Sequence, residues 1–394
     1  MASSRQDRPY DVVLLGATGF TGALTAEYLA GAAARAAAAG EPATRWALAG
    51  RNSEKLAALA QRLGVDVPLL HADVDDPASL RELAESTRVV ATTVGPYIRY
   101  GEPLVAACAA AGTDYADLTG EPEFVDLMYV RHHATAVENG ARIVHCCGFD
   151  SIPHDLGALF TVQQLPEGQP LRVAGYVRAG ARMSGGTLDS ALTAFSHIRS
   201  SAQAASARRK AEGRPDGRRV HGDRGVPKHV GGAVGWALPL PTIDPQIVLR
   251  SARALDRYGP DFSYGHYAAF RKLPMAVGAG VTLPSLVLAA QLSPVRKALT
   301  SRLGSGQGPS EEERAKSWFK VRFEGSAADG TQVVTEVAGG DPGYTETAKM
   351  LAESALCLAH DALPERAGQL TTAVAMGDAL RERLQRAGMT FRVV

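Results

Sequence analysis

The segment DVVLLGATGFTG (residues 11–22) decides the fold of the N-terminal part of this chain. Its apolar run, Val12–Leu15, predicts a buried strand, and the glycine-rich turn that follows leads into an Ala- and Leu-rich helix over residues 20–38. A glycine-rich turn between a strand and a helix lets backbone N–H groups approach a pyrophosphate at the positive end of the helix. The spacing is GxxGxxG rather than the usual GxGxxG. The prediction of a dinucleotide site therefore depends on the position of the turn between a strand and a helix as well as on its glycines.

Strands and helices alternate from this segment to about residue 150. Strands are predicted at 11–15, 45–50, 67–73, 88–95, 114–118 and 141–148. Helices are predicted at 20–38, 53–63, 77–85, 101–111 and 122–139. Apolar strands that alternate with helices form a parallel sheet covered on both faces. We therefore expect an α/β protein whose N-terminal domain, residues 1–150, is a Rossmann-type doubly wound parallel sheet.

The pattern changes after Pro153. Residues 171–179 alternate between apolar and polar, and residues 318–339 predict two strands joined by a turn. These strands indicate a second α+β domain over residues 151–345, with a mainly antiparallel sheet. Two segments within it, 202–232 and 301–313, contain few large apolar side chains and are expected to be loops. Two amphipathic helices follow in the last fifty residues.

The composition excludes several classes of partner. Lys and Arg number 42 and Asp and Glu 41, so no overall positive field favours binding to nucleic acid. The four cysteines show no CxxC motif, and the N-terminus shows no signal-peptide pattern. Both features favour a cytoplasmic protein with reduced thiols.

One uncharged stretch, residues 273–292, is long enough to cross a bilayer, but two prolines and two glycines interrupt any continuous helix. Basic pairs flank it on both sides. We expect this stretch to line an acyl-binding pocket or to touch the inner face of the plasma membrane peripherally, not to span it.

The choice of cofactor depends on the second strand. An NAD site usually places Asp or Glu at the end of that strand to bind the ribose hydroxyls. This strand ends instead in Ala49-Gly50-Arg51-Asn52, and Arg51 can pair with the 2′-phosphate of NADP, assisted by Ser53 and Lys55. The alternative is that Arg51 is an ordinary surface residue, because 34 of the 42 basic residues are arginines. Position and the missing carboxylate favour NADP.

Two further strand ends complete the expected cofactor site. Asp73 is the last residue of the third strand, where it could meet the adenine or cap the next turn. At the fourth strand, Gly95 and Pro96 would turn the backbone beside the nicotinamide ribose, and Tyr97 either overhangs the reactive ring or simply packs. The candidate cofactor residues are Gly16, Thr18, Gly19, Phe20, Thr21, Gly22, Arg51, Asn52, Asp73, Thr93, Val94, Gly95 and Pro96.

Several longer motifs point to a known family. They include GATGFTG (16–22), TTVGPYIRYGEPLVAACAAAGTDYADLTGE (92–121), HCCGFDSIPHDLG (145–157) and GGDPGYTETAKMLAE (339–353). With these motifs the chain resembles the saccharopine dehydrogenase-like oxidoreductases, and most of all the actinobacterial trans-acting enoyl reductases. The resemblance covers nearly the whole chain except residues 200–235. It implies a Rossmann domain, a second α/β domain, and final helices (346–394) that pack on the first domain.

The resemblance also implies an activity. The best-known bacterial members of the family reduce an enoyl double bond on polyketide-derived acyl chains that are destined for long-chain lipids and glycolipids, which implies a lipid-linked or carrier-bound substrate. Such a reaction needs a nicotinamide, a donor for the developing oxyanion, a proton for the α carbon and a dry site.

Three residues are candidates for the catalytic chemistry: Tyr97, Asp150 and His154. Asp150 and His154 are four residues apart and could form an acid–base pair on one helical face. The favoured alternative is that Asp150 or Ser151 caps a helix with Pro153 in its first turn. No metal site is expected, because the adjacent cysteines at 146 and 147 would point to opposite faces of a strand.

Three functions remain open at this point. The first is an NADP-dependent enoyl reductase. The second is an imine reductase of the saccharopine dehydrogenase type, whose substrate would need a convergent cationic pocket. The third is a nucleotide-binding protein at a membrane without catalytic activity.

Overall fold

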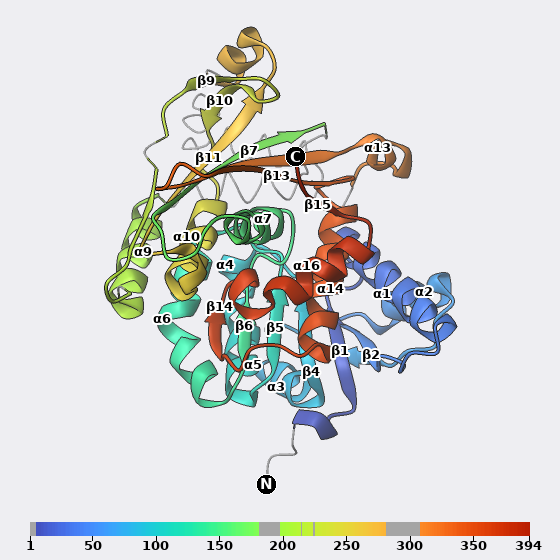
Figure 1. The fold of residues 1–394 in the computed structure, drawn as a ribbon. Coiled ribbons are helices and arrows are strands. Elements are labelled where there is room, and N and C mark those ends of the chain that lie inside the picture. Colours follow the sequence, from blue (N-terminus) through green and yellow to red (C-terminus); the bar gives the residue numbers. More distant parts are fainter. Residues whose placement is uncertain (1–4, 181–197, 214, 224, 281–307) are drawn as a thin grey trace. The chain divides into compact units, whose positions relative to one another are not determined.

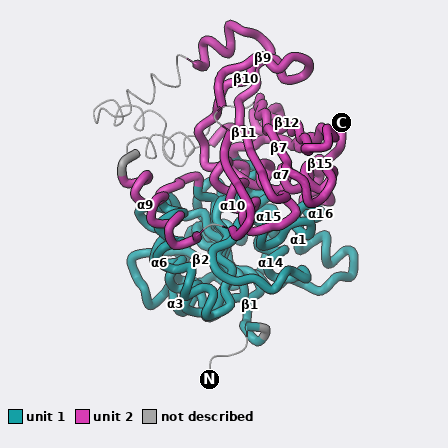
Figure 2. Tube along the Cα trace, turned by 60° about the vertical axis from the view of Figure 1, so that its left-hand side comes forward, with its two compact units in different colours: residues 1–119, 124–148, 344–383 teal, residues 120–123, 149–343, 384–394 magenta. Residues whose placement is uncertain are grey.

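The chain forms two compact units in the computed structural model, which describes residues 5–180, 198–213, 215–223, 225–280 and 308–394. Unit 1 contains residues 1–119, 124–148 and 344–383, and unit 2 contains residues 120–123, 149–343 and 384–394 (Figure 2). Unit 1 is therefore discontinuous in sequence, because its last segment is separated from the rest by almost all of unit 2.

Unit 1 is built on a seven-stranded parallel sheet with the order β14-β6-β5-β4-β1-β2-β3 (Figure 1). Its strands are β1 (Tyr10–Leu15), β2 (Trp46–Gly50), β3 (Leu69–His71), β4 (Thr87–Thr92), β5 (Asp114–Asp117), β6 (Arg142–Val144) and β14 (Gly368–Leu370). The first six follow the Rossmann order, with the reversal of strand order between β1 and β4. The expected Rossmann-type sheet is confirmed.

Helices cover both faces of this sheet. In sequence order they are η1 (Arg5–Asp7), α1 (Phe20–Ala38), α2 (Ser53–Leu63), α3 (Pro77–Ser86), α4 (Tyr97–Tyr100), α5 (Glu102–Ala111), α6 (Pro122–Glu138), α14 (Thr345–His360), α15 (Thr372–Ala375) and α16 (Gly377–Arg386), the last of which continues into unit 2. Helices α1 and α14 pack together over one face, and α3 and α5 over the other. Side-chain caps at Asn52 and Asp76 start α2 and α3, and left-handed glycines at 64 and 112 end α2 and α5.

Unit 2 is built on an eight-stranded mixed sheet. Its path is β15-β13-β12-β7-β11-β10-β9, and β8 pairs with β11 in addition. The strands are β7 (Leu171–Ala179), β8 (Arg219–Gly222), β9 (Lys228–Gly231), β10 (Gly235–Pro239), β11 (Asp261–Phe270), β12 (Phe319–Ala327), β13 (Gln332–Gly339) and β15 (Thr390–Val393). Strand β11 runs parallel to both β7 and β8, and the other pairs are antiparallel.

Unit 2 also contains helices. They are α7 (Ile152–Gln163), α9 (Ile198–Glu212), α10 (Asp244–Ala254), η2 (Asp256–Tyr258) and α13 (Glu311–Lys316). Helix α7 packs on β7, β12 and β13, and a buried hydrogen bond of 2.6 Å joins the hydroxyls of Thr161 and Thr335. Helix α10 packs on α7 and β11, and Ser251 donates a hydrogen bond to the buried Asp155 carboxylate. These contacts position the polar groups described below.

Several expected elements differ from the structure. The segment 202–232 is not a loop, because it contains most of α9 and the strands β8 and β9. Of the expected loop 301–313, residues 301–307 lie outside the described residues and the rest begins α13, where Ser310 and Glu313 form a capping box. The sheet of unit 2 is mainly antiparallel, as expected, but β11 pairs in parallel with β7 and β8. The end of the chain is not all helical, because β15 pairs with β13 in the sheet of unit 2.

The uncharged stretch 273–292 is only partly described. Residues 273–280 are helical, and residues 281–292 lie outside the described residues. Within the described parts of the chain, no helix combines the length and the apolar character needed to cross a membrane.

Candidate functional site

The glycine turn between β1 and α1 leaves an open helix N-terminus. Gly16 has a φ of +87°, and a Cβ at Gly22 would overlap the carbonyl oxygen of Gly16, so both positions need glycine. The Gly19 N–H donates to this same carbonyl at 3.1 Å, whereas a Cβ at Gly19 would meet only that oxygen, at 3.4 Å. Gly19 is the exposed N-cap of α1 and adds no side-chain cap, and the first turn of α1 carries no acidic residue. The turn therefore fits a bound pyrophosphate.

The remaining predicted residues of the turn differ in exposure. Thr18 is exposed, and Thr21 is half-buried with its carbonyl accepting a hydrogen bond from Thr25 Oγ1. The Phe20 ring packs edge-on against Tyr344, with ring centroids 4.8 Å apart. Thr18 is thus available to a ligand, and Phe20 contributes to packing at the start of α1.

The end of β2 fits a 2′-phosphate. Arg51 is exposed and makes no ion pair or hydrogen bond with another described residue. The neighbouring Asn52 has a structural task, because its Oδ1 accepts the Lys55 N–H at 2.8 Å and caps α2. No carboxylate follows β2 before Glu54. An unpaired guanidinium at this position is the feature expected of an NADP site.

Asp73 takes part in a local turn after β3. Its Oδ1 accepts the Asp75 N–H at 3.1 Å, and its own N–H donates to Ser79 Oγ at 3.0 Å. Asp76, rather than Asp73, caps α3 through the Ala78 N–H. This geometry builds the turn and leaves the role of Asp73 toward adenine as a prediction.

The end of β4 packs directly on the glycine turn. Thr93 Oγ1 donates to the Gly16 carbonyl at 3.1 Å, and a Cβ at Gly16 would also come within 2.8 Å of Val94. Gly95 and Pro96 are joined by a cis peptide bond. The predicted residues of β1 and β4 therefore lie together at the carboxyl edge of the sheet, at the point where the strand order reverses.

Tyr97 is buried, and its hydroxyl both donates and accepts a hydrogen bond within the protein. It donates to the Thr92 carbonyl at 3.1 Å and accepts the Leu118 N–H at 3.2 Å, and its ring packs on Phe124. This geometry favours packing over overhanging the nicotinamide, the two alternatives that the sequence left open.

A buried network at the ends of β5 and β6 was not predicted. The Asp117 carboxylate accepts hydrogen bonds from the Tyr115 hydroxyl (2.9 Å), from His145 Nδ1 (2.6 Å) and from the N–H groups of Thr119 (3.1 Å) and Cys146 (3.0 Å). Cys146 has a φ of +62°, the left-handed region that a non-glycine residue seldom adopts. The strand predicted over 141–148 therefore ends at Val144, because the chain turns to bind Asp117.

His145 Nε2 in this network is buried and has no hydrogen-bond partner among the described residues. The ring is enclosed by Tyr115 and Phe124. The sequence gives no signal for this network, since Asp117 ends β5 and His145 follows β6, 28 residues further along the chain.

Asp150 does not cap a helix, contrary to the favoured expectation. The N-cap of α7 is Ser151, which makes no side-chain cap bond, and the Asp150 carboxylate forms no hydrogen bond with another described residue. Gly120 makes room for it, because a Cβ there would lie 3.0 Å from Asp150 Oδ2. Burial, and then the negative charge of Asp244, raise the pKa of Asp150 to about 7.

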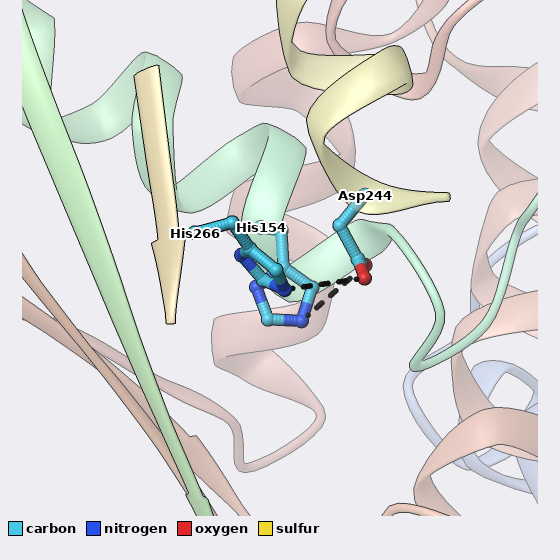
Figure 3. Close-up of side chains that lie close together, drawn as sticks. All are labelled: His154, Asp244 and His266. Carbon is cyan, nitrogen blue, oxygen red and sulfur yellow. Dashed lines mark ion pairs between the residues drawn. The ribbon is translucent and has the colours of Figure 1, made fainter. Parts of the chain in front are cut away.

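His154 is paired with Asp244 rather than with Asp150. Its Nε2 lies 3.4 Å from Asp244 Oδ1, and its ring stands edge-on to His266 with centroids 4.8 Å apart (Figure 3). Burial lowers the pKa of His154 to about 4, although Asp244 opposes this shift, so the imidazole is neutral at pH 7. Burial also disfavours ionisation of Asp244, yet the two imidazoles and Thr242 hold the pKa of its carboxyl below the usual value.

Comparisons with known proteins identify relatives of this chain. The model of the saccharopine dehydrogenase NADP-binding domain matches residues 12–144. The protein Rv2449c of Mycobacterium tuberculosis is 39% identical over 417 residues, covering 98% of this chain and 97% of its own length. The trans-acting enoyl reductases of Mycobacterium leprae and Mycobacterium ulcerans are 36% and 34% identical, each over 98% of both chains. The chain belongs to the saccharopine dehydrogenase-like family of trans-acting enoyl reductases.

Solved structures support the fold of this family member. Saccharopine dehydrogenase (L-Glu forming) from Saccharomyces cerevisiae aligns over 98% of this chain and 100% of its own, with a TM-score of 0.56 and 13% identity. At that identity the likeness concerns the fold alone.

The expected NADP cofactor is confirmed by the family model, whose matched residues include the glycine turn and Arg51. Two structural observations fit the cofactor. The turn between β1 and α1 has glycines at positions 16, 19 and 22, so no side chain at these positions occupies the space beside the N-terminus of α1. Arg51, just after β2, makes no ion pair with another described residue. When it is bound, NADPH supplies a hydride.

Proposed function

We propose that this family member is an NADPH-dependent enoyl reductase that acts on an acyl chain linked to a lipid or a polyketide carrier. The observation that carries the proposal is the family relationship over almost the whole chain, because relatives at 34–36% identity are named for this activity. The match to an NADP-binding domain agrees with this activity, because an enoyl reductase needs a nicotinamide nucleotide as the hydride donor.

In this proposal the glycine turn and the end of β2 bind the nucleotide. The first amides of α1 hold the pyrophosphate, with Thr18 adding a hydroxyl, and Arg51 holds the 2′-phosphate. Thr93 and Val94 support the turn from β4, and Gly95 and Pro96 border the nicotinamide ribose.

Asp150 is the proposed proton donor for the α carbon of the substrate. A donor must be protonated in a useful fraction at neutral pH, and its pKa of about 7 meets that condition. Its carboxyl is not engaged by another described residue, whereas the Tyr97 hydroxyl already donates to a backbone carbonyl. His154 is a poorer donor, since its imidazole is neutral at pH 7.

A lipid-linked substrate and peripheral membrane contact belong to the proposal as well. Three apolar side chains in the described part of the uncharged stretch, Leu273, Met275 and Val277, are 46–58% exposed. Apolar groups exposed next to the basic pair Arg271-Lys272 suit contact with an acyl chain or an anionic lipid surface.

The test is NADPH oxidation with enoyl thioesters of increasing chain length, offered on coenzyme A, on pantetheine and on an acyl carrier protein. The wild type should oxidise NADPH and yield the saturated thioester, and Asp150→Asn should lower kcat by about 10²–10⁴-fold with NADPH affinity unchanged. Asp66→Asn, which removes an exposed carboxylate in unit 1, is the matched control and should keep full activity.

Two outcomes would contradict the proposal. Oxidation of NADPH with a mixture of a 2-oxo acid and an amine, but with no enoyl thioester, would assign the chain to imine reduction instead. NADPH binding without turnover of any of these substrates would favour a nucleotide-binding protein that lacks catalysis.

A further inference from the structure

Three side chains of unit 2 converge in its interior, and neither the sequence motifs nor the family relationship assigns them a role together. They are His154 of α7, Asp244 at the start of α10 and His266 of β11, and they point toward one another (Figure 3). Their exposed fractions are 2%, 3% and 7%. A buried carboxylate between two imidazoles needs partners that satisfy its oxygens and the ring nitrogens.

The distances within this group do not suit direct hydrogen bonds. His154 Nε2 lies 3.4 Å from Asp244 Oδ1, and His266 Nε2 lies 3.4 Å from Asp244 Oδ2. A hydrogen bond between such groups would measure about 2.7–3.2 Å. Asp244 Oδ1 and His266 Nε2 accordingly count among the buried atoms without a hydrogen-bond partner in the described chain.

The same distances suit ligands of one metal ion. With metal–ligand bonds of about 2.0–2.2 Å and tetrahedral angles, two ligand atoms stand roughly 3.3–3.4 Å apart. The ligand atoms of the three residues all lie within 4.8 Å of one another. A single ion can therefore bridge the rings and the carboxylate, and it would provide partners for both unsatisfied atoms.

We propose that His154, Asp244 and His266 bind one divalent transition-metal ion, with Zn²⁺ as the best match. Two imidazoles and one carboxylate are a common zinc ligand set, whereas Mg²⁺ and Ca²⁺ prefer sites made of oxygen atoms alone. With Asp244 binding through one oxygen, the three protein ligands leave a fourth position for water or an oxygen of a small molecule, as at zinc sites that take part in chemistry.

Residues around the ligands orient them for this task. The Tyr264 hydroxyl lies 3.2 Å from His266 Nδ1, so this nitrogen can donate to Tyr264 while Nε2 faces Asp244. Thr242 Oγ1 donates to Asp244 Oδ2 and holds the carboxylate from the other side. Such outer contacts set the tautomer and the ring orientation of a metal-binding histidine.

The binding test uses the full chain without a histidine tag, stripped of metal by a chelator and then dialysed. Titration with Zn²⁺, followed by calorimetry and by elemental analysis after gel filtration, should give one ion per chain. Co²⁺ should produce the intense visible absorption of a tetrahedral site, and Zn²⁺ should abolish it. Neither readout needs an enoyl substrate, so the metal site and the proposed reductase activity can fail separately.

Variants locate the ion. His266→Gln and Asp244→Asn should weaken Zn²⁺ binding by at least ~100-fold, and Tyr264→Phe by about 10–100-fold. The control is His229→Gln, which removes an exposed histidine of unit 2 and should bind Zn²⁺ as the wild type does. Near-UV circular dichroism and thermal melts check that unit 2 is folded in each variant, and NADPH affinity checks unit 1, to which the nucleotide residues belong.

Absence of stoichiometric Zn²⁺ or Co²⁺ binding by the wild type would overturn the proposal without recourse to any variant. Equal binding by wild type and His266→Gln would do the same. In either case the three residues would form a polar cluster that holds α7, α10 and β11 together without an ion.

Discussion

At the scale of single residues, Arg51 carries the choice between NADPH and NADH. Arg51→Ala should weaken NADPH binding by about 1.5–3 kcal/mol, which corresponds to roughly tenfold to a hundredfold in affinity, because it removes a charge-assisted hydrogen bond to the 2′-phosphate. Binding of NADH, which lacks that phosphate, should hardly change. Fluorescence titrations with both nucleotides measure the difference.

Arg62→Ala provides the control for this prediction, since Arg62 is an exposed arginine nearby in the sequence, within α2. It should leave both affinities unchanged. Equal losses for NADPH and NADH in Arg51→Ala would show that Arg51 acts on something other than the 2′-phosphate.

Asp150 should also affect stability in a pH-dependent manner. Its folded pKa of about 7 exceeds the value near 4 of an unfolded Asp, so between these pH values the folded chain binds more protons. The contribution of Asp150 to stability should therefore fall as the pH rises from about 4 to about 7, and the difference between wild type and Asp150→Asn separates it from the opposite contribution of His154, whose pKa is lowered. Asp150→Asn has no proton to lose there, and its Tm at pH 8 should exceed that of the wild type by at least ~2 °C.

This comparison is made in buffer with a chelator, so that no cation offsets the charge of Asp244. Asp66→Asn, at an exposed position, should shift Tm little at any pH. A constant Tm difference between Asp150→Asn and wild type from pH 4 to pH 8 would contradict the raised pKa, and with it the reason for choosing Asp150 as the donor.

At the scale of elements, the glycine turn separates folding from binding. Gly19→Val should abolish NADPH binding with little change in Tm, because a Cβ at position 19 meets only one backbone oxygen, at 3.4 Å, and the side chain would occupy the pyrophosphate position. Gly22→Ala should instead lower Tm strongly, since its Cβ would overlap the Gly16 carbonyl. Circular dichroism melts and nucleotide titrations on the same samples measure both effects.

Retained NADPH affinity in Gly19→Val would mean that the nucleotide binds elsewhere. A Gly22→Ala variant as stable as the wild type would show that the turn can relax away from α1, against the close contact described above.

Regular elements of unit 1 could be predicted because local sequence specifies them. The apolar run of β1, the N-caps Asn52 and Asp76, and the glycines that end α2 and α5 act within a few residues. Strand β11 could not be predicted in the same way. Six consecutive residues, 262–267, are buried, so the alternation typical of a half-exposed strand is absent. The end of β6 also escaped prediction, because Asp117 of another strand turns the chain there.

At the scale of the whole molecule, sequence spacing predicts a cofactor site at the strand ends, but it gives no signal for the groups that depend on tertiary contacts. Residues 16–22 and Arg51 come directly after the first and second strands. In a doubly wound sheet, ligands bind at the carboxyl ends of the strands, so these residues can be chosen from the sequence alone. The neighbours of His154 could not be anticipated in this way, since Asp244 and His266 lie far along the chain and no spacing motif connects them. The helical capping expected for Asp150 failed for a related reason: the local pattern was present, but Ser151 occupies the N-cap.

The last prediction concerns contact of the molecule with lipid. Leu273 and Met275 are exposed beside Arg271 and Lys272, so an anionic membrane could take up the apolar groups while its head groups attract the basic pair. Wild-type protein should float with vesicles that contain phosphatidylglycerol, and less with neutral vesicles. Leu273→Glu combined with Met275→Glu should lose most of this flotation, whereas Val226→Glu, at a position 64% exposed elsewhere in unit 2, should keep it. NADPH affinity should be the same in all three proteins because the nucleotide residues belong to unit 1.

If the wild type does not float but the double variant turns over long-chain enoyl thioesters more slowly than short ones, the apolar residues serve the acyl chain rather than a membrane. Normal flotation and normal long-chain turnover in the double variant would remove the structural support for a lipid-linked substrate and leave that part of the proposal to the family relationship alone.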